Sequence, residues 1–126
     1  MVQRKRLLLV PHFTENGALW YLPGGGVDFL ESLEDAAKRE FEEETGFHAK
    51  LTSPPTVIQC IDPDEPYHSL TFAYSGEIVG GELRPEPSRW GPKLPKWFSR
   101  EELSGVQVVP YLQKFVTEHF ADVRRD

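Results

Sequence analysis

The chain has 126 residues, of which 39% are hydrophobic and 27% are charged, and its formal net charge is −6. These values predict one water-soluble domain over residues 1–126. The acidic balance disfavours a nucleic-acid duplex or an anionic membrane as partner, so an anionic ligand would need metal ions or a few placed cations. No stretch reaches the roughly 18 apolar residues that span a bilayer, and the apolar run after Arg6 ends at Pro11, too soon for a signal peptide. We therefore expect a cytoplasmic protein.

The first residues of the chain predict two strands joined by a turn. Apolar runs at residues 6–10 and 19–22 are typical of buried strands. The sequence Glu-Asn-Gly at residues 15–17 supplies the turn between them. The second strand then runs into Pro23 and three glycines, which break the regular structure.

A helix follows this glycine-rich break, over residues 32–45. Ser32 can act as its N-cap, with Asp35 at the third helical position as in a weak capping box. Gly46 can end the helix, because glycine adopts the left-handed conformation that closes helices without steric cost. Both helix ends are therefore specified locally.

The middle of the chain is rich in apolar and β-branched residues and predicts strands. Cys60 is the single cysteine and lies in one of these apolar runs, so we expect a buried free thiol and exclude a disulfide framework. The predicted strands are Phe47–Leu51, Thr56–Asp62, 69–78 and 97–98, and the predicted loops are 80–81 and 85–95.

Two further helical segments complete the pattern. Residues 99–103 resemble a short capped turn, and Pro110 at a first helical position opens a last helix over residues 110–121. Strands on both sides of one helix, followed by a terminal helix, predict a mixed α/β domain. The expected buried face of the last helix consists of Tyr111, Leu112, Phe115, Val116, His119 and Phe120.

The helix over residues 32–45 carries an unusual concentration of glutamates near its end. At 100° per residue, Glu40, Glu43 and Glu44 continue the apolar stripe that begins at Leu33, whereas Glu42 lies on the opposite face. Carboxylates about 5–6 Å apart on a helix repel one another by roughly 3 kcal/mol at an effective dielectric constant of about 20. The three glutamates on the apolar stripe are therefore expected to face inward, in a region that is not plain core.

Two explanations for these glutamates remain open. A solvated acidic face is the first, and it predicts that Mg²⁺ changes neither stability nor activity. The second is a metal site, because partly buried carboxylates need pairing, protonation or a metal, and Arg39 can offset only one charge. Carboxylates suit Mg²⁺ or Mn²⁺ rather than zinc, and the glycines at residues 24–26 would let the backbone approach a metal or phosphate. The histidines are scattered along the chain, at His12, His48, His68 and His119.

Residues 25–47 resemble a complete Nudix box. Gly25, Glu31 and the run Arg-Glu-Phe-Glu-Glu-Glu-Thr-Gly-Phe at residues 39–47 match its fixed positions. Leu30 departs from the pattern, because a glycine commonly precedes the first glutamate, and aromatic residues replace aliphatic ones at Phe41 and Phe47. The segments 20–23, 80–83 and 97–98 are also similar to the family.

The resemblance implies an α/β/α sandwich with a mixed sheet. The family usually has one strand more before the strand at residues 7–10, and only residues 1–6 remain for it here. The first edge of the sheet is therefore expected to be short, rearranged or completed by a partner chain. Because unpaired edges pair with other strands, a homodimer is one expectation.

The resemblance also implies a Mg²⁺-dependent pyrophosphohydrolase and the roles of its site residues. Glu40, Glu43 and Glu44 would bind Mg²⁺, with Mn²⁺ as an alternative ion and with help from a backbone carbonyl near Gly24. The general base is either a box residue such as Glu40 or a glutamate of a downstream loop. Glu86 is the loop candidate for a base or a further metal ligand, although a solvated loop glutamate explains it equally well.

Two charged residues complete the catalytic set that the resemblance implies. Arg39 would orient the glutamates, and Glu31 would be its ion-pair partner. The expected reaction is attack by water at phosphorus in a nucleoside diphosphate linked to another group. Bound Mg²⁺ supports such a reaction by neutralising the phosphates and activating the water.

The substrate is less clearly indicated. Pro63 lies near a position that resembles ADP-ribose hydrolases, so an ADP-ribose-like nucleotide sugar is favoured. Nucleoside triphosphate pyrophosphohydrolysis and a nucleotide-sensing module with weak activity are the alternatives. A basic cluster near the presumed site could attract phosphates, or could be solvated; it consists of Arg84, Arg89, Lys93 and Lys96. Aromatic side chains that could stack on a base, or pack in the core, are Trp20, Phe29, Tyr67 and Trp90.

Overall fold

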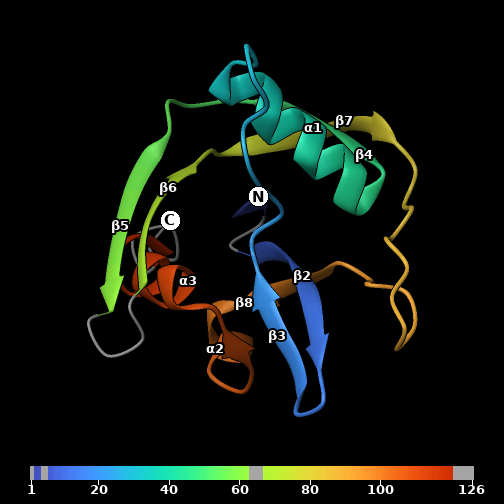
Figure 1. The fold of residues 1–126 in the computed structure, drawn as a ribbon, viewed down its shortest axis with the longest axis vertical. Coiled ribbons are helices and arrows are strands. Elements are labelled where there is room, and N and C mark those ends of the chain that lie inside the picture. The colour runs from blue at the N-terminus through green and yellow to red at the C-terminus, as the bar shows by residue number, and fades with distance from the viewer. Residues whose placement is uncertain (1, 4–5, 63–66, 121–126) are drawn as a thin grey trace.

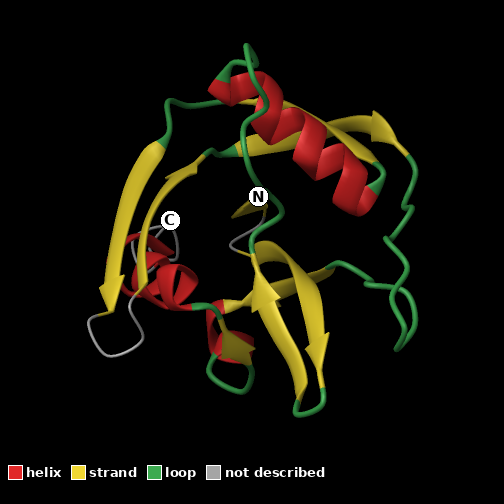
Figure 2. Ribbon diagram, in the orientation of Figure 1, coloured by secondary structure: helices red, strands yellow, loops and turns green. Residues whose placement is uncertain are grey.

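The computed structural model describes residues 2–3, 6–62 and 67–120. Its helices lie on two sides of the strands (Figures 1 and 2). Helix α1 (Leu33–Thr45) packs on β4 (Phe47–Leu51), and α3 (Pro110–Phe115) packs on β5 (Thr56–Asp62). The α/β class that the sequence predicts is confirmed. Within the described residues, no helix is both long enough and apolar enough to cross a membrane.

A mixed sheet forms the centre of the molecule. Its strand order is β1-β2-β3-β9, with β8 also paired to β2; β3 and β9 are parallel and the other pairs are antiparallel. The expected extra strand before residues 7–10 exists as β1, which is short. The strands are β1 (Val2–Gln3), β2 (Arg6–Thr14), β3 (Gly17–Tyr21), β8 (Lys96–Ser99) and β9 (Gln107–Val108).

The core lies between this sheet and the C-terminal helices. Strand β2 has neighbours on both edges and is buried from Leu7 to Val10, as expected for a central apolar strand. Trp20 meets Phe98 edge to face, with ring centroids 4.8 Å apart. The buried cluster consists of Leu7, Leu9, Phe98, Leu103, Leu112 and Phe120.

Two further strand pairs replace a predicted single strand. The prediction of one strand over residues 69–78 is wrong, because the chain turns at residues 74–75 and the two halves pair with different partners. The prediction of a loop at residues 80–81 is also wrong, because these are the last two residues of β7 (Gly76–Gly81). At Gly81 a Cβ would come within 2.4 Å of the Gly46 carbonyl oxygen, so only glycine fits there. The strands are β4 (Phe47–Leu51), β5 (Thr56–Asp62), β6 (Tyr67–Ala73) and β7 (Gly76–Gly81).

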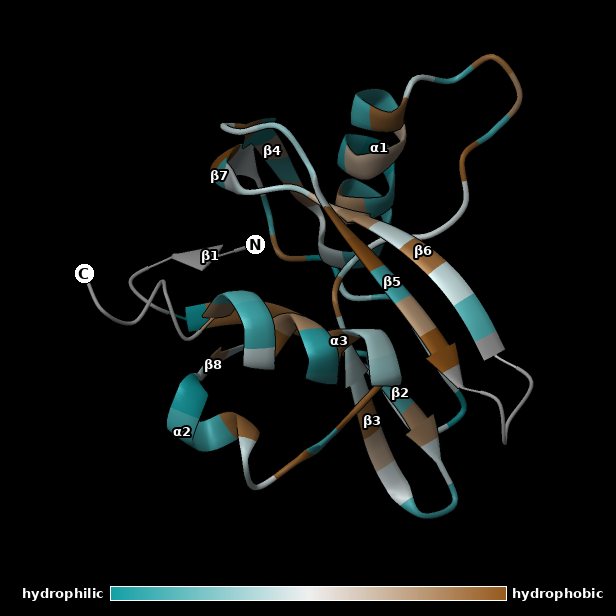
Figure 3. Ribbon diagram, turned by 90° about the vertical axis from the view of Figure 1, so that its left-hand side faces the viewer, coloured by the Kyte–Doolittle hydropathy of each residue, from teal (hydrophilic) through white to brown (hydrophobic). Residues whose placement is uncertain are grey.

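Exposed apolar side chains mark the β5–β6 pair. Val57 and Phe72 are cross-strand neighbours, and both are exposed, as are Ile61 and Leu70. Figure 3 shows hydrophobic residues along both strands. Cys60 on β5 is a free thiol, as predicted, but it is only partly buried; in the described part of the chain, β5 has a neighbouring strand on one edge alone.

The ends of α1 follow the sequence signals. Ser32 is the N-cap and accepts a hydrogen bond from the Asp35 N–H at 3.1 Å. Gly46 is left-handed (φ 86°) and ends the helix. A Cβ at Gly46 would lie 2.1 Å from the Glu82 carbonyl oxygen, so the chain after β7 passes directly over the helix end. This close crossing brings the loop that carries Glu86 to the same end of α1.

The C-terminal helices agree with the prediction in part. The capped turn is present as α2 (Arg100–Leu103), with a reciprocal capping box between Ser99 and Glu102. Helix α3 continues as a π-helix over Val116–Phe120, and the predicted end at residue 121 lies outside the described residues. Of the expected buried face, only Leu112 and Phe120 are fully buried, because one side of α3 alone packs on the core.

Candidate active site

The Arg39 side chain is the centre of an ion-pair network. Its guanidinium contacts Glu31 at 2.8 and 3.0 Å, Glu40 at 2.9 Å and Glu43 at 3.0 Å. It also donates to the Gly26 carbonyl at 3.0 Å, which ties the glycine-rich loop to the helix. The ion pair between Arg39 and Glu31, expected from the resemblance, is present in two-pronged geometry.

This network perturbs the titration of its members. Hydrogen bonds from Arg39 lower the pKa of Glu31, helped by the Asp28 N–H. The same contacts raise the pKa of Arg39, the bond to Glu31 contributing most. Arg39 therefore holds two of the helix glutamates while remaining fully charged.

Glu44 is the buried member of the acidic group. The residue is 7% exposed, and its carboxylate accepts a hydrogen bond from the Gly24 N–H at 2.7 Å. Burial raises the pKa of Glu44 to about 7, although the bond from Gly24 opposes this shift. The charges of Glu40 and Glu86 also raise the pKa of Glu44, so all three carboxylates share one electrostatic environment. A bound cation would relieve this repulsion.

Gly25 makes room for Glu40. A Cβ at Gly25 would lie 2.7 Å from the carboxyl carbon of Glu40 and 2.8 Å from both its oxygens. The glutamate occupies the space that any other residue at position 25 would fill. By contrast, a Cβ at Gly26 would meet nothing within 4 Å.

The prediction for Glu43 is wrong in one respect. We expected it to face inward with Glu40 and Glu44, but its side chain is 53% exposed. Leu33, which begins the same stripe, is also exposed, whereas Ala36 and Phe41 are buried. Glu42 lies on the other side of the helix, as expected, and contacts His48 at 2.6 Å.

The carboxylates do not form a closed metal cage in the described part of the chain. No three acidic, histidine or cysteine side chains there converge on one point. Arg39 engages Glu40 and Glu43, whereas the Gly24 N–H engages Glu44. The donor set nevertheless fits Mg²⁺ or Mn²⁺, because it offers several hard carboxylate oxygens at one helix end.

The loop after β7 brings two further charged groups to this end of α1. Glu86 forms an isolated β-bridge with Lys93, and its charge acts on Glu44 and Tyr21. Lys93 Nζ donates to the hydroxyl of Tyr21 at 3.2 Å. Sequence reasoning did not single out Tyr21; the one available signal is its position just before the Pro-Gly-Gly-Gly break.

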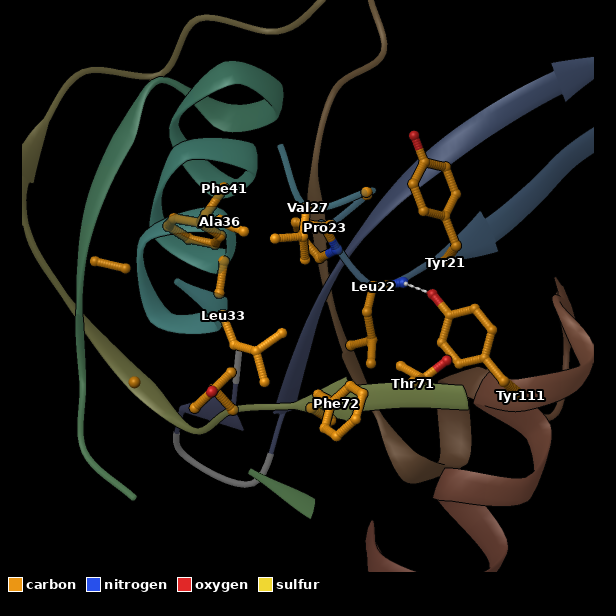
Figure 4. A pocket seen from close by; sticks show the side chains of 18 of the residues that line it. Tyr21, Leu22, Pro23, Val27, Leu33, Ala36, Phe41, Thr71, Phe72 and Tyr111 are labelled. Atoms are coloured by element: carbon orange, nitrogen blue, oxygen red, sulfur yellow. Dashed lines mark hydrogen bonds between the residues drawn. The ribbon is translucent and has the colours of Figure 1, made fainter. Parts of the chain in front are cut away.

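An apolar pocket of about 700 Å³ adjoins the carboxylates. Residues 24–26 line it, and Gly24 and Gly25 also lie against Glu44 and Glu40, so one loop joins the two features. Helix α1 contributes Leu33, Ala36 and Phe41; Figure 4 shows Leu33 toward Phe72, and Ala36 and Phe41 across from Pro23 and Val27. Other lining residues come from β3 and the chain just after it, from β6 and from the start of α3; they include Tyr21, Leu22, Thr71, Phe72 and Tyr111.

Several predicted substrate residues lie elsewhere. Trp20 packs on the core, and Phe29 is 91% exposed on the loop before α1; neither lines the pocket within the described residues. Arg84 lies at a smaller hollow beside Glu42 and His48. Pro63 and the Tyr67 side chain lie outside what the structure describes.

The pocket residues were missed by sequence reasoning. Thr71 and Phe72 belonged to a strand that was predicted as one piece with β7, and Tyr111 was assigned to the core. The Tyr111 hydroxyl accepts a hydrogen bond from the Leu22 N–H at 3.2 Å, which fixes the ring at the pocket wall (Figure 4). No local pattern signals such a long-range contact.

Three curated proteins are similar to this chain. They are an RNA pyrophosphohydrolase of Novosphingobium aromaticivorans (36% identical over 76 residues), an ADP-ribose pyrophosphatase of Methanocaldococcus jannaschii (38% over 63) and a putative 8-oxo-dGTP diphosphatase of Bacillus subtilis (39% over 80). The matches cover 60%, 50% and 64% of this chain but only 45%, 37% and 50% of those proteins, respectively. The chain thus spans about half the length of these relatives, or less.

Two further comparisons cover most of this chain; one concerns the fold and the other the family. A Nudix hydrolase from Nitrosomonas europaea superposes with a TM-score of 0.76 over 95% of this chain and 83% of that one, at 22% identity. The family model described as NUDIX domain matches residues 1–119. The chain therefore belongs to the Nudix family.

Proposed function

We propose that this protein is a Mg²⁺-dependent pyrophosphohydrolase that cleaves a nucleoside diphosphate linked to another moiety. The observation that carries the proposal is the joint arrangement of Arg39, Glu40 and Glu43 with the buried Glu44 on the Gly24 N–H. These charges lie beside an apolar pocket, and residues 24–26 belong to both. A diphosphate at the carboxylates could therefore have its organic part in the pocket.

The metal would be held by carboxylates of α1. Glu40, Glu43 and Glu44 are the proposed ligands of Mg²⁺ or Mn²⁺, and the Gly24 carbonyl and Glu86 are further candidates. When bound, the ion supplies charge neutralisation for the phosphates and activation of a water molecule. The raised pKa of Glu44 supports this assignment, because an unpaired buried carboxylate gains most from a cation.

The other polar residues would orient these groups. Arg39, anchored by Glu31, holds the Glu40 and Glu43 carboxylates in place and links them to the Gly26 carbonyl. Either Glu40 or Glu86 would accept the proton of the attacking water. Fixed carboxylates accelerate such a step because their orientation need not be reached during the reaction.

An ADP-ribose-like nucleotide sugar is the favoured substrate. A pocket of about 700 Å³ has room for a nucleoside, and Phe72 and Tyr111 offer aromatic surface to a base. The relative named ADP-ribose pyrophosphatase supports this choice. Nucleoside triphosphate pyrophosphohydrolysis is the second candidate, favoured by the relative named as a putative 8-oxo-dGTP diphosphatase.

A substrate panel tests the proposal. ADP-ribose, UDP-glucose, a dinucleoside polyphosphate, dGTP, 8-oxo-dGTP and a 5′-triphosphorylated oligoribonucleotide are each incubated with Mg²⁺, with Mn²⁺ or with a chelator. We expect cleavage of ADP-ribose to AMP and ribose 5-phosphate, lost with the chelator. Release of pyrophosphate from dGTP or 8-oxo-dGTP alone would favour the second candidate. Nucleotide binding without turnover would favour the sensing module and contradict the proposed enzyme.

A further inference from the structure

Tyr21 and Lys93 form a pair beside the buried glutamate, although neither belongs to the motif at residues 25–47. The Lys93 ammonium donates to the Tyr21 hydroxyl at 3.2 Å and lies 5.6 Å from the centre of the Tyr21 ring. Burial and the charges of Glu44 and Glu86 raise the pKa of the Tyr21 hydroxyl. The hydroxyl thus contacts a lysine and lies within the electrostatic influence of two carboxylates.

The backbone fixes Lys93 in this place. Its N–H donates to the Glu86 carbonyl at 2.8 Å, as part of the β-bridge between these two residues. Tyr21 ends β3 just before the glycine-rich loop, and Figure 4 shows its hydroxyl directed away from Tyr111 and the apolar part of the pocket. Two segments far apart in the sequence thereby bring a cation and a hydroxyl to the edge of the carboxylate group.

Lys93 forms no ion pair with another described residue. Among the described residues, the ion pairs are formed by Lys38, Arg39, His48 and His119. Arg39 is already engaged by Glu31, Glu40 and Glu43 and cannot serve a ligand without releasing them. Lys93 therefore supplies a positive charge beside the carboxylates that forms no ion pair among the described residues, although its charge also acts on Glu44.

We propose that Lys93 binds the diphosphate group of the substrate and that Tyr21 is its positioning residue. The inference rests on the proposed function and extends it, because it assigns recognition of the phosphates to residues outside the motif. The Tyr21 hydroxyl restricts the flexible lysine to the edge of the carboxylate group, where its ammonium can reach a phosphate oxygen. Without this restraint, the four-carbon stem of lysine would sample many positions.

The test measures binding of a probe that cannot be cleaved. The affinity for α,β-methylene ADP-ribose in Mg²⁺ is measured by calorimetry for the wild type, Lys93→Met and Lys93→Arg. We expect the dissociation constant to rise about tenfold in Lys93→Met and by less than about threefold in Lys93→Arg. Lys96→Met is the matched control, because it removes the same charge from a lysine that lies over the Phe98 ring rather than beside Tyr21. If Lys93→Met lowers the melting temperature, Lys93→Gln replaces it.

Tyr21→Phe tests the positioning role. We expect the dissociation constant to rise about threefold in Tyr21→Phe, because the ammonium loses its partner. In the double variant with Lys93→Met, removal of the hydroxyl should have no additional effect, since there is no lysine left to position. A merely structural role of Tyr21 would instead give the same increase in both backgrounds.

The possible results separate this inference from the proposed function. If the wild type binds the analogue and Lys93→Met matches Lys96→Met within twofold, the role of Lys93 is refuted while the enzyme proposal stands. If the wild type neither binds the analogue nor cleaves any member of the substrate panel, both fail together. An additive effect of Tyr21→Phe in the double variant would refute the positioning role of Tyr21 but leave the role of Lys93 in place.

Discussion

Helix α1 adjoins two regions of unlike chemistry. At its C-terminal end, Arg39, Glu40 and Glu43 form a network of charged hydrogen bonds within a few residues of one another. Along its covered face, Ala36 and Phe41 line an apolar pocket together with residues from β3, β6 and α3. The glycine-rich loop at residues 24–26 adjoins both regions.

From this difference we infer that chemistry and substrate specificity are separated in the proposed enzyme. The charged end depends on spacing within one helix and the preceding loop, so changes there should affect turnover for any substrate. The pocket depends on side chains gathered from distant parts of the chain, so changes there should alter the affinity for particular substrates. The following experiments test this separation, from the largest expected effect to the smallest.

Glu43→Gln should nearly abolish hydrolysis. The change removes a proposed ligand charge but keeps the volume of an exposed side chain, so kcat should fall about a thousandfold while the melting temperature stays within a few degrees. Steady-state kinetics and thermal melting measure the two effects. Glu42→Gln is the matched control, since Glu42 lies on the opposite face and contacts His48. Near wild-type turnover in Glu43→Gln would refute the ligand assignment.

Gly25→Ala should impair turnover without unfolding the protein. The new methyl group would displace the Glu40 carboxylate, whose carbon lies 2.7 Å from the added Cβ. Misplacement of this size should lower kcat/KM about a hundredfold. Gly26→Ala is the control, because its Cβ would meet nothing within 4 Å. Equal losses in both variants would show that the loop needs glycine for its backbone rather than for Glu40.

The stability of the metal-free protein should depend on pH through Glu44. Burial raises the pKa of Glu44 from 4.5 to about 7, so the folded state retains a proton that the unfolded chain releases. Stability should therefore fall as pH rises from about 4.5 to about 7, by at most about 3 kcal/mol. Because the ionised carboxylate binds the cation, stabilisation by Mg²⁺ should grow over the same interval.

Urea denaturation between pH 4.5 and 8 measures this linkage, with a chelator and with Mg²⁺. Glu44→Gln should flatten the pH dependence and reduce the stabilisation by Mg²⁺. If the wild type and Glu44→Gln give parallel curves, Glu44 is not the responsible group.

Phe72→Ala should weaken substrate binding and leave the charged end intact. Loss of the aromatic surface in the pocket should raise KM about tenfold, with kcat nearly unchanged. Val57→Ala is the control, because Val57 is the cross-strand neighbour of Phe72 but does not line the pocket. A fall in kcat with constant KM would contradict the separation of the two regions.

Leu30→Gly should stabilise the loop between the two regions slightly. Leu30 has φ 68° and is 89% exposed, so it has the steric cost of a left-handed backbone without gaining burial. Glycine removes this cost but loses more entropy on folding, which leaves a net gain of about 0.5 kcal/mol. Leu30→Ala, which keeps a Cβ, should give no gain in urea denaturation. If alanine stabilises as much as glycine, backbone strain is not the cause.

The sequence by itself determined the local features of this protein. The cap at Ser32, the left-handed Gly46 and the ion pair of Arg39 with Glu31 all lie as predicted, because each depends on residues close together in the chain. The unusual Leu30 was also visible as a departure from the family pattern, and its positive φ explains why glycine is common at that position.

Only the tertiary structure decided which side chains meet over long distances. The periodicity of α1 placed Glu43 with Glu44, but only Glu44 is buried, where it accepts from the Gly24 N–H, whereas the Glu43 side chain is half exposed. The break between β6 and β7, the pocket and the pair of Tyr21 with Lys93 likewise depend on segments distant in sequence. Such contacts follow from how whole elements pack. Packing sets the burial of each side chain, and burial in turn sets its charge. Local spacing in the sequence encodes neither the packing nor the burial.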